Sequence, residues 1–283
     1  EPTGPMTVVM TAVVTSLIAA NPENGMAMAF TVVMLAGLFQ ILFGVLKLGK
    51  YITLMPYSVV SGFMSGIGLI LIILQLAPAL GQSSPGGGVI GTLMALPTLL
   101  SNTVTIEMAL FAMTLFILFF TPAKIKKNIP PQLIALIMIS IVSVIAIGGE
   151  PIQRIGAIDV SLPNMVLPNF TQDQVRVMLL DALVLGMLGC IDSMLTSVIA
   201  DNLTRTEHKS NKELIGQGLG NIMSGLFGGL PGAGATMGTV VNIQSGGRTA
   251  LSGLVRVVVL IVAVFGAASL IEMIPLAVLA GIA

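Results

Sequence analysis

Long apolar segments alternate with short polar stretches along most of the chain. A helix needs about 20 apolar residues to cross the hydrocarbon core of a bilayer. Segments that approach or exceed this length predict membrane-spanning helices at residues 25–48, 52–80, 107–121, 131–148, 174–200, 214–229 and 251–271. Residues 81–102 carry no charged side chain, and we expect a loop there with an interfacial helix near 93–100. The pattern therefore predicts an all-α polytopic membrane protein.

Two further apolar segments are too short to cross a bilayer as single helices. The first covers residues 4–20, with Thr3 as its expected N-cap and a proline in its first turn. The second begins near Ala235 or Thr236 and ends near Gln244. At 1.5 Å per residue it is about 15 Å long, half of a hydrocarbon core. We therefore predict two short helices that each end inside the membrane.

A glycine-rich stretch at residues 230–234 leads into the second short helix. If that helix ends in the membrane, this extended approach lies deep in the membrane as well. Irregular backbone persists there only where it lines a cavity enclosed by protein, because each unpaired amide facing lipid costs several kcal/mol. The sequence therefore predicts a binding cavity near the bilayer midplane.

Basic residues in the loops orient these segments. Counting both short helices as crossings places the following basic positions on one side of the membrane: 47, 50, 124, 126, 127, 205, 209, 212 and 248. Arg154 is the basic residue of the opposite loops. The positive-inside rule makes the lysine-rich side cytoplasmic.

Composition narrows the class of partner. The mean hydropathy is +1.03, 8% of the residues are charged, and 12 basic residues balance 12 acidic ones. Such a chain offers no basic surface for nucleic acid, and the lipid bilayer is its expected partner. The one cysteine, Cys190, excludes an intramolecular disulfide, and we expect it to be a small buried side chain.

An internal repeat relates the two halves of the chain. Residues 56–63 and 275–282 share the pattern P-x-x-V-x-x-G at the same spacing. Each copy follows a full span that itself follows one of the two short helices. The loop orientation gives the copies inverted topology, so the short helices point their N-termini at each other near the midplane. Each N-terminus offers free amides and about half a positive charge, which predicts an anion site.

Polar side chains within the spans suggest a second ion. Asp192 and Thr196 lie one turn apart on one helical face. An aspartate within a span costs about 3 kcal/mol or more unless it is paired or hydrated. Its carboxylate, the hydroxyl of Thr196 and bared carbonyls of residues 234–236 would form a hard oxygen set that suits sodium. Alternatively, Asp192 hydrogen-bonds a neighbouring helix and has a structural role.

Other ionisable residues carry weaker predictions. Asp181 lies nearer the outer end of the same span, where we expect a hydrated entrance residue. Glu107 and Glu272 lie close to the ends of spans, and we expect both to reach water. His208 lies in the polar loop at residues 201–213, where we expect it to be solvated.

Three sequence segments together resemble a known family. They are EPTGPMTVVMTAVV, PYSVVSGFMSGIGLI and GGLPGAGATMGTVVNIQSGGRTALSGL. They are similar to the third, fifth and tenth transmembrane segments of the sulfate permease family, also called solute carrier family 26. Asp192 with Thr196, and Gly234-Ala235-Thr236, make the chain resemble most the sodium-dependent bicarbonate transporters of cyanobacteria within that family.

The resemblance implies a fold of seven plus seven segments in inverted repeats, with a core and a gate domain. We then expect core segments 3 and 4 at residues 1–50 and gate segments 5 to 7 at residues 51–148. A connection at 149–173 would lead to core segments 8 to 11 at 174–273 and to the start of gate segment 12 at 274–283. The first two segments, the last two and a cytoplasmic STAS domain would lie outside this chain. The family also implies a homodimer.

The resemblance assigns roles to individual residues. It places bicarbonate at Thr3 and Ala235, the N-termini of the two short helices. It places sodium at Asp192, Thr196, Gly234 and Thr236. Between Lys212 and Arg248 there is no basic residue, which argues against a chloride exchanger and fits a bound sodium ion as the source of positive charge.

The implied function is coupled uptake of sodium and bicarbonate across the plasma membrane, with the core domain moving as an elevator. This makes the protein a secondary transporter and not an enzyme, since no nucleophile and base occur together in the spans. Two alternatives stay open. One is a proton-coupled sulfate or dicarboxylate transporter that uses the same site. The other is a membrane scaffold or sensor that binds an anion without moving it.

Overall fold

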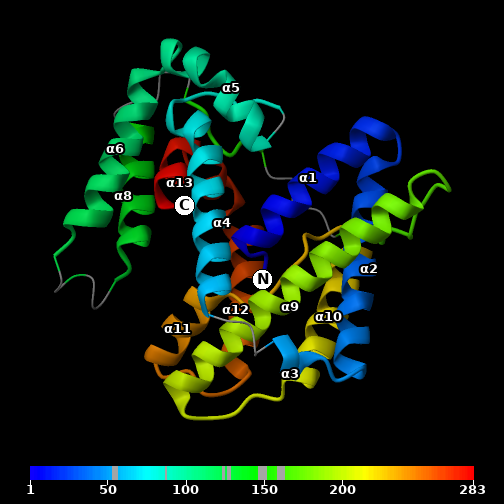
Figure 1. Ribbon diagram of the computed structural model, residues 1–283. Coiled ribbons are helices and arrows are strands. Elements are labelled where there is room, and N and C mark those ends of the chain that lie inside the picture. Colours follow the sequence, from blue (N-terminus) through cyan, green and yellow to red (C-terminus); the bar gives the residue numbers. More distant parts are fainter. Residues whose placement is uncertain (53–56, 87, 123–124, 126–128, 146–151, 158–162) are drawn as a thin grey trace. The chain divides into compact units, whose positions relative to one another are not determined.

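The computed structural model describes all residues except 53–56, 87, 123–124, 126–128, 146–151 and 158–162. Within the described ranges the regular elements are helices (Figure 1), and an isolated antiparallel bridge joins Arg154 to Pro275. The helices in chain order are α1 (Gly4–Ala20), α2 (Gly25–Val45), α3 (Gly49–Ile52), α4 (Tyr57–Ala79), α5 (Gly88–Ser101), α6 (Thr105–Phe120), α8 (Pro131–Ile145), α9 (Val175–Thr204), α10 (Ser210–Leu226), α11 (Thr236–Gln244), α12 (Leu251–Glu272) and α13 (Leu276–Ile282).

The two short helices that the sequence predicts are confirmed as α1 and α11. The predicted loop at 201–213 is too long, because α9 continues to Thr204 and α10 already begins at Ser210. Arg205 ends α9 in the left-handed conformation, with φ of 56°. The predicted interfacial helix is also longer than expected, since α5 covers Gly88–Ser101. Pro56, the first residue of the repeat motif, lies outside the described residues.

Among the described helices, α2, α9 and α12 are each long and apolar enough to cross a membrane alone. The pair α5 and α6 meets the same test when joined, with a bend of 113° between the two helices. Three shorter segments are also apolar, at Gly4–Ala20, Gly68–Ala79 and Pro131–Ile145. The expected span at 131–148 runs on into undescribed residues. These features fit a multi-pass membrane protein.

The chain divides into two compact units. The first contains Glu1–Met64 and Leu162–Leu254, and the second contains Ser65–Ser161 and Val255–Ala283. The first unit extends beyond the expected core, 1–50 and 174–273, at residues 51–64 and 162–173, and it lacks residues 255–273. Most of the missing residues belong to α12, which has no buried residue and from Val255 on falls in the second unit. The assignment of core and gate to the units stays a prediction.

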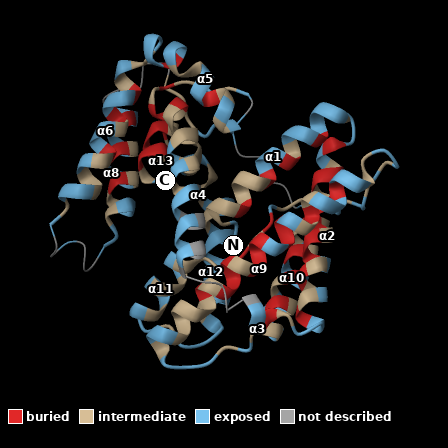
Figure 2. Cartoon of the chain, in the orientation of Figure 1, coloured by how far each residue is buried: buried red, intermediate tan, exposed pale blue. Residues whose placement is uncertain are grey.

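The first unit packs around one face of α1. The buried residues of this helix recur at intervals of three and four positions, which places them in one stripe: Met6, Met10, Val13 and Leu17. The stripe packs against α2 and α9 in a single buried cluster that also includes Val32, Leu185 and Ala233. Figure 2 shows this buried material concentrated where α2, α9 and α10 meet. The short helix α1 is thereby fixed against α9.

Glycines allow α2 and α10 to approach at backbone contact. A Cβ atom added at Gly37 would lie 2.5 Å from the carbonyl oxygen of Gly218, and one added at Gly218 would lie 2.4 Å from that of Gly37. Further along, a Cβ atom at Gly225 would lie 2.7 Å from the carbonyl oxygen of Phe30. The hydrophobic effect does not drive helices together in lipid. Small residues stabilise such contacts because they allow close van der Waals packing of the two backbones. The α2–α10 pair is therefore a rigid support for the segment that follows α10.

In the second unit, α6, α8 and α13 share a buried cluster that includes Leu110, Ile139 and Val278. The extended residues near Arg154 join these helices at one end. Gln153 donates its amide to Glu107 Oε1 at 2.8 Å and accepts the amide of Leu276 at 2.9 Å. The expectation that Glu107 reaches water is wrong, since Glu107 is only 1% exposed. The folded-back connection covers the carboxylate.

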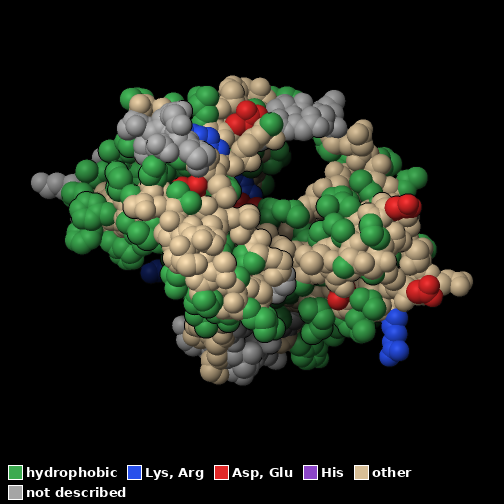
Figure 3. Space-filling model, turned by 90° about the horizontal axis from the view of Figure 1, so that it is seen from above, with side chains coloured by type: hydrophobic (Ala, Val, Ile, Leu, Met, Phe, Trp, Pro, Cys, Tyr) green, Lys and Arg blue, Asp and Glu red, His purple; other side chains and the backbone are tan. Residues whose placement is uncertain are grey.

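Apolar side chains also cover much of the surface. The middle of α12 from Leu254 to Val262 exposes large aliphatic side chains, and Figure 2 shows this helix without buried residues. In the view of Figure 3, hydrophobic side chains are spread over the visible face and acidic or basic ones occur at isolated places. Such a surface is stable in contact with lipid tails or further helices and unfavourable in water.

We predict that Gly218→Ala destabilises the α2–α10 contact, because the added methyl group meets backbone atoms that cannot rotate away. Overpacking of this kind costs typically 1–3 kcal/mol. Thermal unfolding of the full-length protein in detergent, followed by circular dichroism, should show a lower midpoint. Gly216→Ala and Gly220→Ala are matched controls on the same helix, because a Cβ atom there meets nothing within 4 Å. An equal midpoint for Gly218→Ala and its controls would contradict the packing argument.

Candidate functional site

One face of α9 carries three adjacent polar side chains that are buried inside the first unit. Asp192 is 3% exposed, Ser193 is 1% exposed and Thr196 is 6% exposed. Their spacing of one, three and four residues places them on neighbouring turns of one helical face. Each of them contacts the start of one of the two short helices. These contacts define the candidate site.

Asp192 contacts the start of α1. The hydroxyl of Thr3 donates to Asp192 Oδ2 at 2.6 Å, across 189 positions of sequence. Thr3 occupies the N-cap position of α1, as the sequence predicts, but its side chain makes no capping hydrogen bond. The hydroxyl of this N-cap residue instead donates its hydrogen bond to the buried carboxylate of Asp192. The first-turn amides of α1 consequently have no side-chain acceptor.

Ser193 and Thr196 hold the residues that lead into α11. The amide of Gly234 donates to Ser193 Oγ at 3.0 Å, and Thr196 Oγ1 donates to the carbonyl oxygen of Gly234 at 2.8 Å. The hydroxyls of Thr196 and Thr236 lie 2.8 Å apart. A Cβ atom at Gly234 would lie 3.0 Å from the Cα of Ser193, so only glycine fits without adjustment. The backbone of α11 thus begins directly on the surface of α9.

The extended approach at residues 230–234 has its polar backbone groups paired one after another. Asn221 on α10 donates to the carbonyl oxygen of Gly232 at 2.9 Å and accepts the amide of the same residue at 2.7 Å. Glu1 and Ala233 exchange backbone hydrogen bonds of 2.9 and 3.1 Å. Ser224 donates to the carbonyl oxygen of Leu230. Side chains and the segment before α1 thus replace the helical hydrogen bonds that this irregular backbone lacks.

Sequence reasoning missed the residues that build this support. Asn221 is 2% exposed and also donates to Gln40, which is fully buried on α2. Both are amide side chains within predicted spans, which is the signal that could have identified them. Ser193 follows Asp192 directly, but a serine in a span more often bonds its own helix. Its contact with Gly234 depends on the fold of the whole unit.

Neither short helix has a side-chain cap. Thr3 is the N-cap of α1 and Ala235 is the N-cap of α11, and no capping hydrogen bond is formed by either side chain. Ala235 has no polar atom that could cap a helix. Unpaired amides and the positive end of the helix dipole favour an anion at both places. The backbone pair between Glu1 and Ala233 brings the two helix starts side by side.

The oxygen atoms around α9 suit a hard monovalent cation. The four predicted sodium ligands are brought together in part: Thr196 contacts both Gly234 and Thr236, while Asp192 lies one turn away on the same face of α9. This set has one carboxylate, two hydroxyls and one carbonyl, all of which are hard ligands. No cluster of three or more His, Cys, Asp or Glu side chains occurs among the described residues, so a site for a transition metal is not found there.

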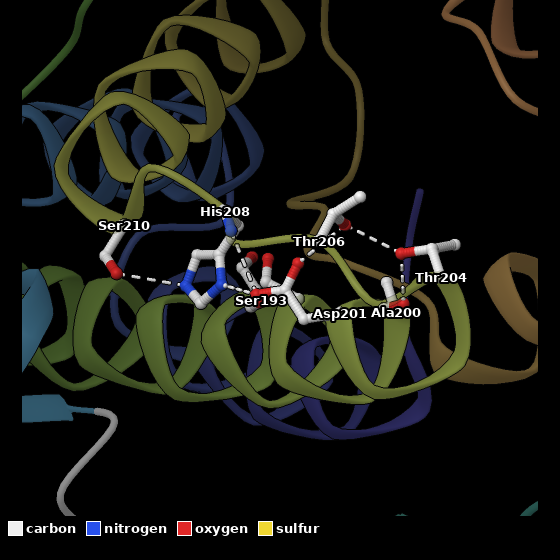
Figure 4. A network of polar contacts seen from close by, with 8 residues as sticks. Ser193, Ala200, Asp201, Thr204, Thr206, His208 and Ser210 are labelled. Carbon is white, nitrogen blue, oxygen red and sulfur yellow. Dashed lines mark hydrogen bonds and ion pairs between the residues drawn. The ribbon is translucent and has the colours of Figure 1, made fainter.

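At the far end of α9 a separate polar network closes the loop to α10 (Figure 4). Asp201 Oδ2 lies 2.6 Å from His208 Nδ1 and accepts the amide of His208 at 2.9 Å. Thr206 donates to the other oxygen of Asp201, and Ser210 Oγ lies 3.0 Å from His208 Nε2. The expectation that His208 is solvated is wrong, since its side chain is 19% exposed and its Nδ1 lies within hydrogen-bonding distance of Asp201. The network fixes the loop and has no contact with Asp192 among the described residues.

Comparisons with known proteins agree on one family. A profile described as the sulfate permease family matches residues 1–283. The chain is 69% identical over its full length to a protein named bicarbonate transporter BicA from Synechocystis, of which it covers 50%. It superposes on the transmembrane domain of a cyanobacterial bicarbonate transporter BicA with a TM-score of 0.95 and 66% identity, covering 100% of this chain and 72% of that one. A murine Slc26a9 anion transporter has the same fold, with a TM-score of 0.80 at 19% identity, over 93% of this chain and 44% of that one.

The chain spans about half the length of the two bicarbonate transporters named BicA among the curated relatives that it matches. Its all-helical fold is that of the two transporter structures, and the seven-plus-seven inverted repeat predicted from the sequence is consistent with that fold.

We predict that Ser193→Ala destabilises the start of α11, because the buried amide of Gly234 loses its acceptor. An unsatisfied buried group costs about 1–3 kcal/mol. The measurement is the midpoint temperature at which half of the buried Cys190 has reacted with a thiol reagent in a fixed time. Ser197→Ala is the matched control, since Ser197 donates only to a carbonyl of its own helix. Equal midpoints for the two variants would rule out a supporting role for Ser193.

Proposed function

We propose that this chain, which belongs to the sulfate permease family, forms part of a transporter that carries bicarbonate and sodium together across the plasma membrane. The observation that carries the proposal is the contact between Thr3 and Asp192. It places a buried carboxylate directly against the start of a helix without a side-chain cap. A carboxylate at this place would repel an anion, so the pairing does not fit a site for an anion alone. It fits a site in which a cation and an anion bind next to each other.

Electrostatics gives the coupling a physical origin. An ionised Asp192 lies beside the place where the anion binds, and two like charges about 4 Å apart repel by about 4 kcal/mol at an effective dielectric constant of 20. Sodium bound at Asp192, Thr196, Gly234 and Thr236 removes that repulsion and orders the start of α11. Bicarbonate then binds between the N-termini at Thr3 and Ala235. Because binding energies are reciprocal, each ion strengthens the binding of the other.

The packing of the first unit supports a carrier that moves its site as one body. Both helix starts are held by α9, and α9 and α10 each pack on α2. A displacement of α9 therefore moves both halves of the site together. We propose that this unit is the core of an elevator and that the second unit belongs to the gate. We also propose that the whole protein is a homodimer with a STAS domain outside this chain.

The substrate assignment follows the similarity to proteins named as bicarbonate transporters. Purified full-length protein in proteoliposomes should take up labelled bicarbonate when sodium is supplied outside, and not when potassium replaces it. Failure with both cations, together with sulfate uptake driven by a proton gradient, would favour the proton-coupled alternative. Binding of bicarbonate without any flux would favour a scaffold or sensor.

Removing the carboxylate tests the cation site directly. We predict that Asp192→Asn abolishes the sodium dependence of bicarbonate uptake and most of the uptake itself. The amide keeps the size of the side chain but cannot supply the negative charge that binds sodium. Asp173→Asn, at an exposed position just before α9, is the matched control and should behave like the wild type. Sodium-driven uptake of wild-type size in Asp192→Asn would refute the assignment.

A further inference from the structure

We infer that the hydroxyl proton of Thr3 couples the cation to the anion by changing its acceptor. Without sodium the proton is donated to Asp192, and with sodium bound it is donated to the anion. This inference rests on the proposed function and concerns the same site. It makes Thr3 a residue that senses the cation, beyond its role as a ligand for bicarbonate.

The contact between Thr3 and Asp192 is short and buried. Thr3 Oγ1 lies 2.6 Å from Asp192 Oδ2, a short distance typical of a hydroxyl that donates to an ionised carboxylate. Asp192 is 3% exposed, so water does not compete effectively for that oxygen. A threonine hydroxyl has a single proton. While that proton is directed at Asp192, Oγ1 presents only lone pairs to any other neighbour.

Thr3 also lies at the start of α1. As the N-cap residue with φ of −97° and ψ of 156°, it lies where an anion would meet the free amides of the first turn. In the absence of sodium, an incoming anion faces both the charge of Asp192 and the lone pairs of Oγ1. Both contributions oppose binding.

The bound cation changes the contact between Thr3 and Asp192. Sodium neutralises the carboxylate and weakens its attraction for the hydroxyl proton. The proton can then turn about the Cβ–Oγ1 bond toward the anion, which requires no movement of the backbone. The hydrogen bond from Thr3 to Asp192 is thus exchanged for one from Thr3 to the anion. The contact between Oγ1 and the anion, which was unfavourable, becomes favourable.

Three other hydroxyls near the site donate to backbone carbonyl oxygens. Thr7 donates to the carbonyl oxygen of Thr3, and Thr11 donates to that of Thr7, within α1. Thr196 donates to the carbonyl oxygen of Gly234 and lies within hydrogen-bonding distance of Thr236. Among the described residues of this site, Thr3 is the hydroxyl that links the buried carboxylate to a helix N-terminus.

The experiment uses Thr3→Val, which has nearly the same shape but lacks the hydroxyl. The bicarbonate concentration for half-maximal uptake by the full-length protein in proteoliposomes is measured at low and at saturating external sodium. We expect this concentration to rise about tenfold or more at saturating sodium, where the lost hydrogen bond joined an anion. At low sodium we expect little change. Sodium therefore lowers the bicarbonate concentration for half-maximal uptake by a smaller factor in Thr3→Val than in the wild type.

Two further variants fix the interpretation. Thr3→Ser keeps the hydroxyl and should retain the sodium effect. Thr11→Val removes a hydroxyl from the same helix that bonds only its own backbone, and should also retain it. If Thr3→Val is not recovered in a folded state, Thr3→Ala replaces it, with the same expectation.

The outcomes separate this inference from the proposed function. An equal rise at low and saturating sodium in Thr3→Val would make Thr3 a simple substrate ligand or a structural residue and overturn the inference. No change at either sodium concentration would also overturn it. If the wild type itself shows no sodium effect, the proposed function fails, and the inference fails with it.

Discussion

The need to pair the polar groups of an unwound backbone governs the structure of the candidate site. Residues 230–234 interrupt the helical path, and their amides and carbonyls find partners on α9, on α10 and on the segment before α1. These partners also decide where the two short helices begin. The same contacts that stabilise the broken backbone therefore create a site with free helix amides on one side and oxygen ligands on the other.

The rest of the first unit can be understood as support for these contacts. Glycines bring α2 and α10 into backbone contact, which positions Asn221 against Gly232. The buried stripe of α1 packs against α2 and α9, which positions Thr3 beside Asp192. In the proposed carrier the site would move as one body, because all of its residues belong to one packed unit.

Much of this arrangement follows from the sequence. The short helices are predicted by their length and by the glycines and prolines before them, and Asp192 with Thr196 is identified by its rarity in a membrane span. Three features depend on long-range contacts and could not be predicted: the acceptor of the Thr3 hydroxyl, the pairing of Ser193 with Gly234, and the burial of Glu107 under the connection at Gln153. The periodicity of apolar residues predicts which face of a helix is buried, but not which residues of other segments contact that face.

The central claim is that both helix starts and α9 form one site for two ions. Hydrogen–deuterium exchange of the purified full-length protein tests this most directly, in peptides that cover residues 1–6 and 232–238. We expect both peptides to exchange more slowly when sodium and bicarbonate are present together, and to be protected much less by either ion alone. Equal protection by bicarbonate in sodium and in potassium, or protection of only one of the two peptides, would contradict it.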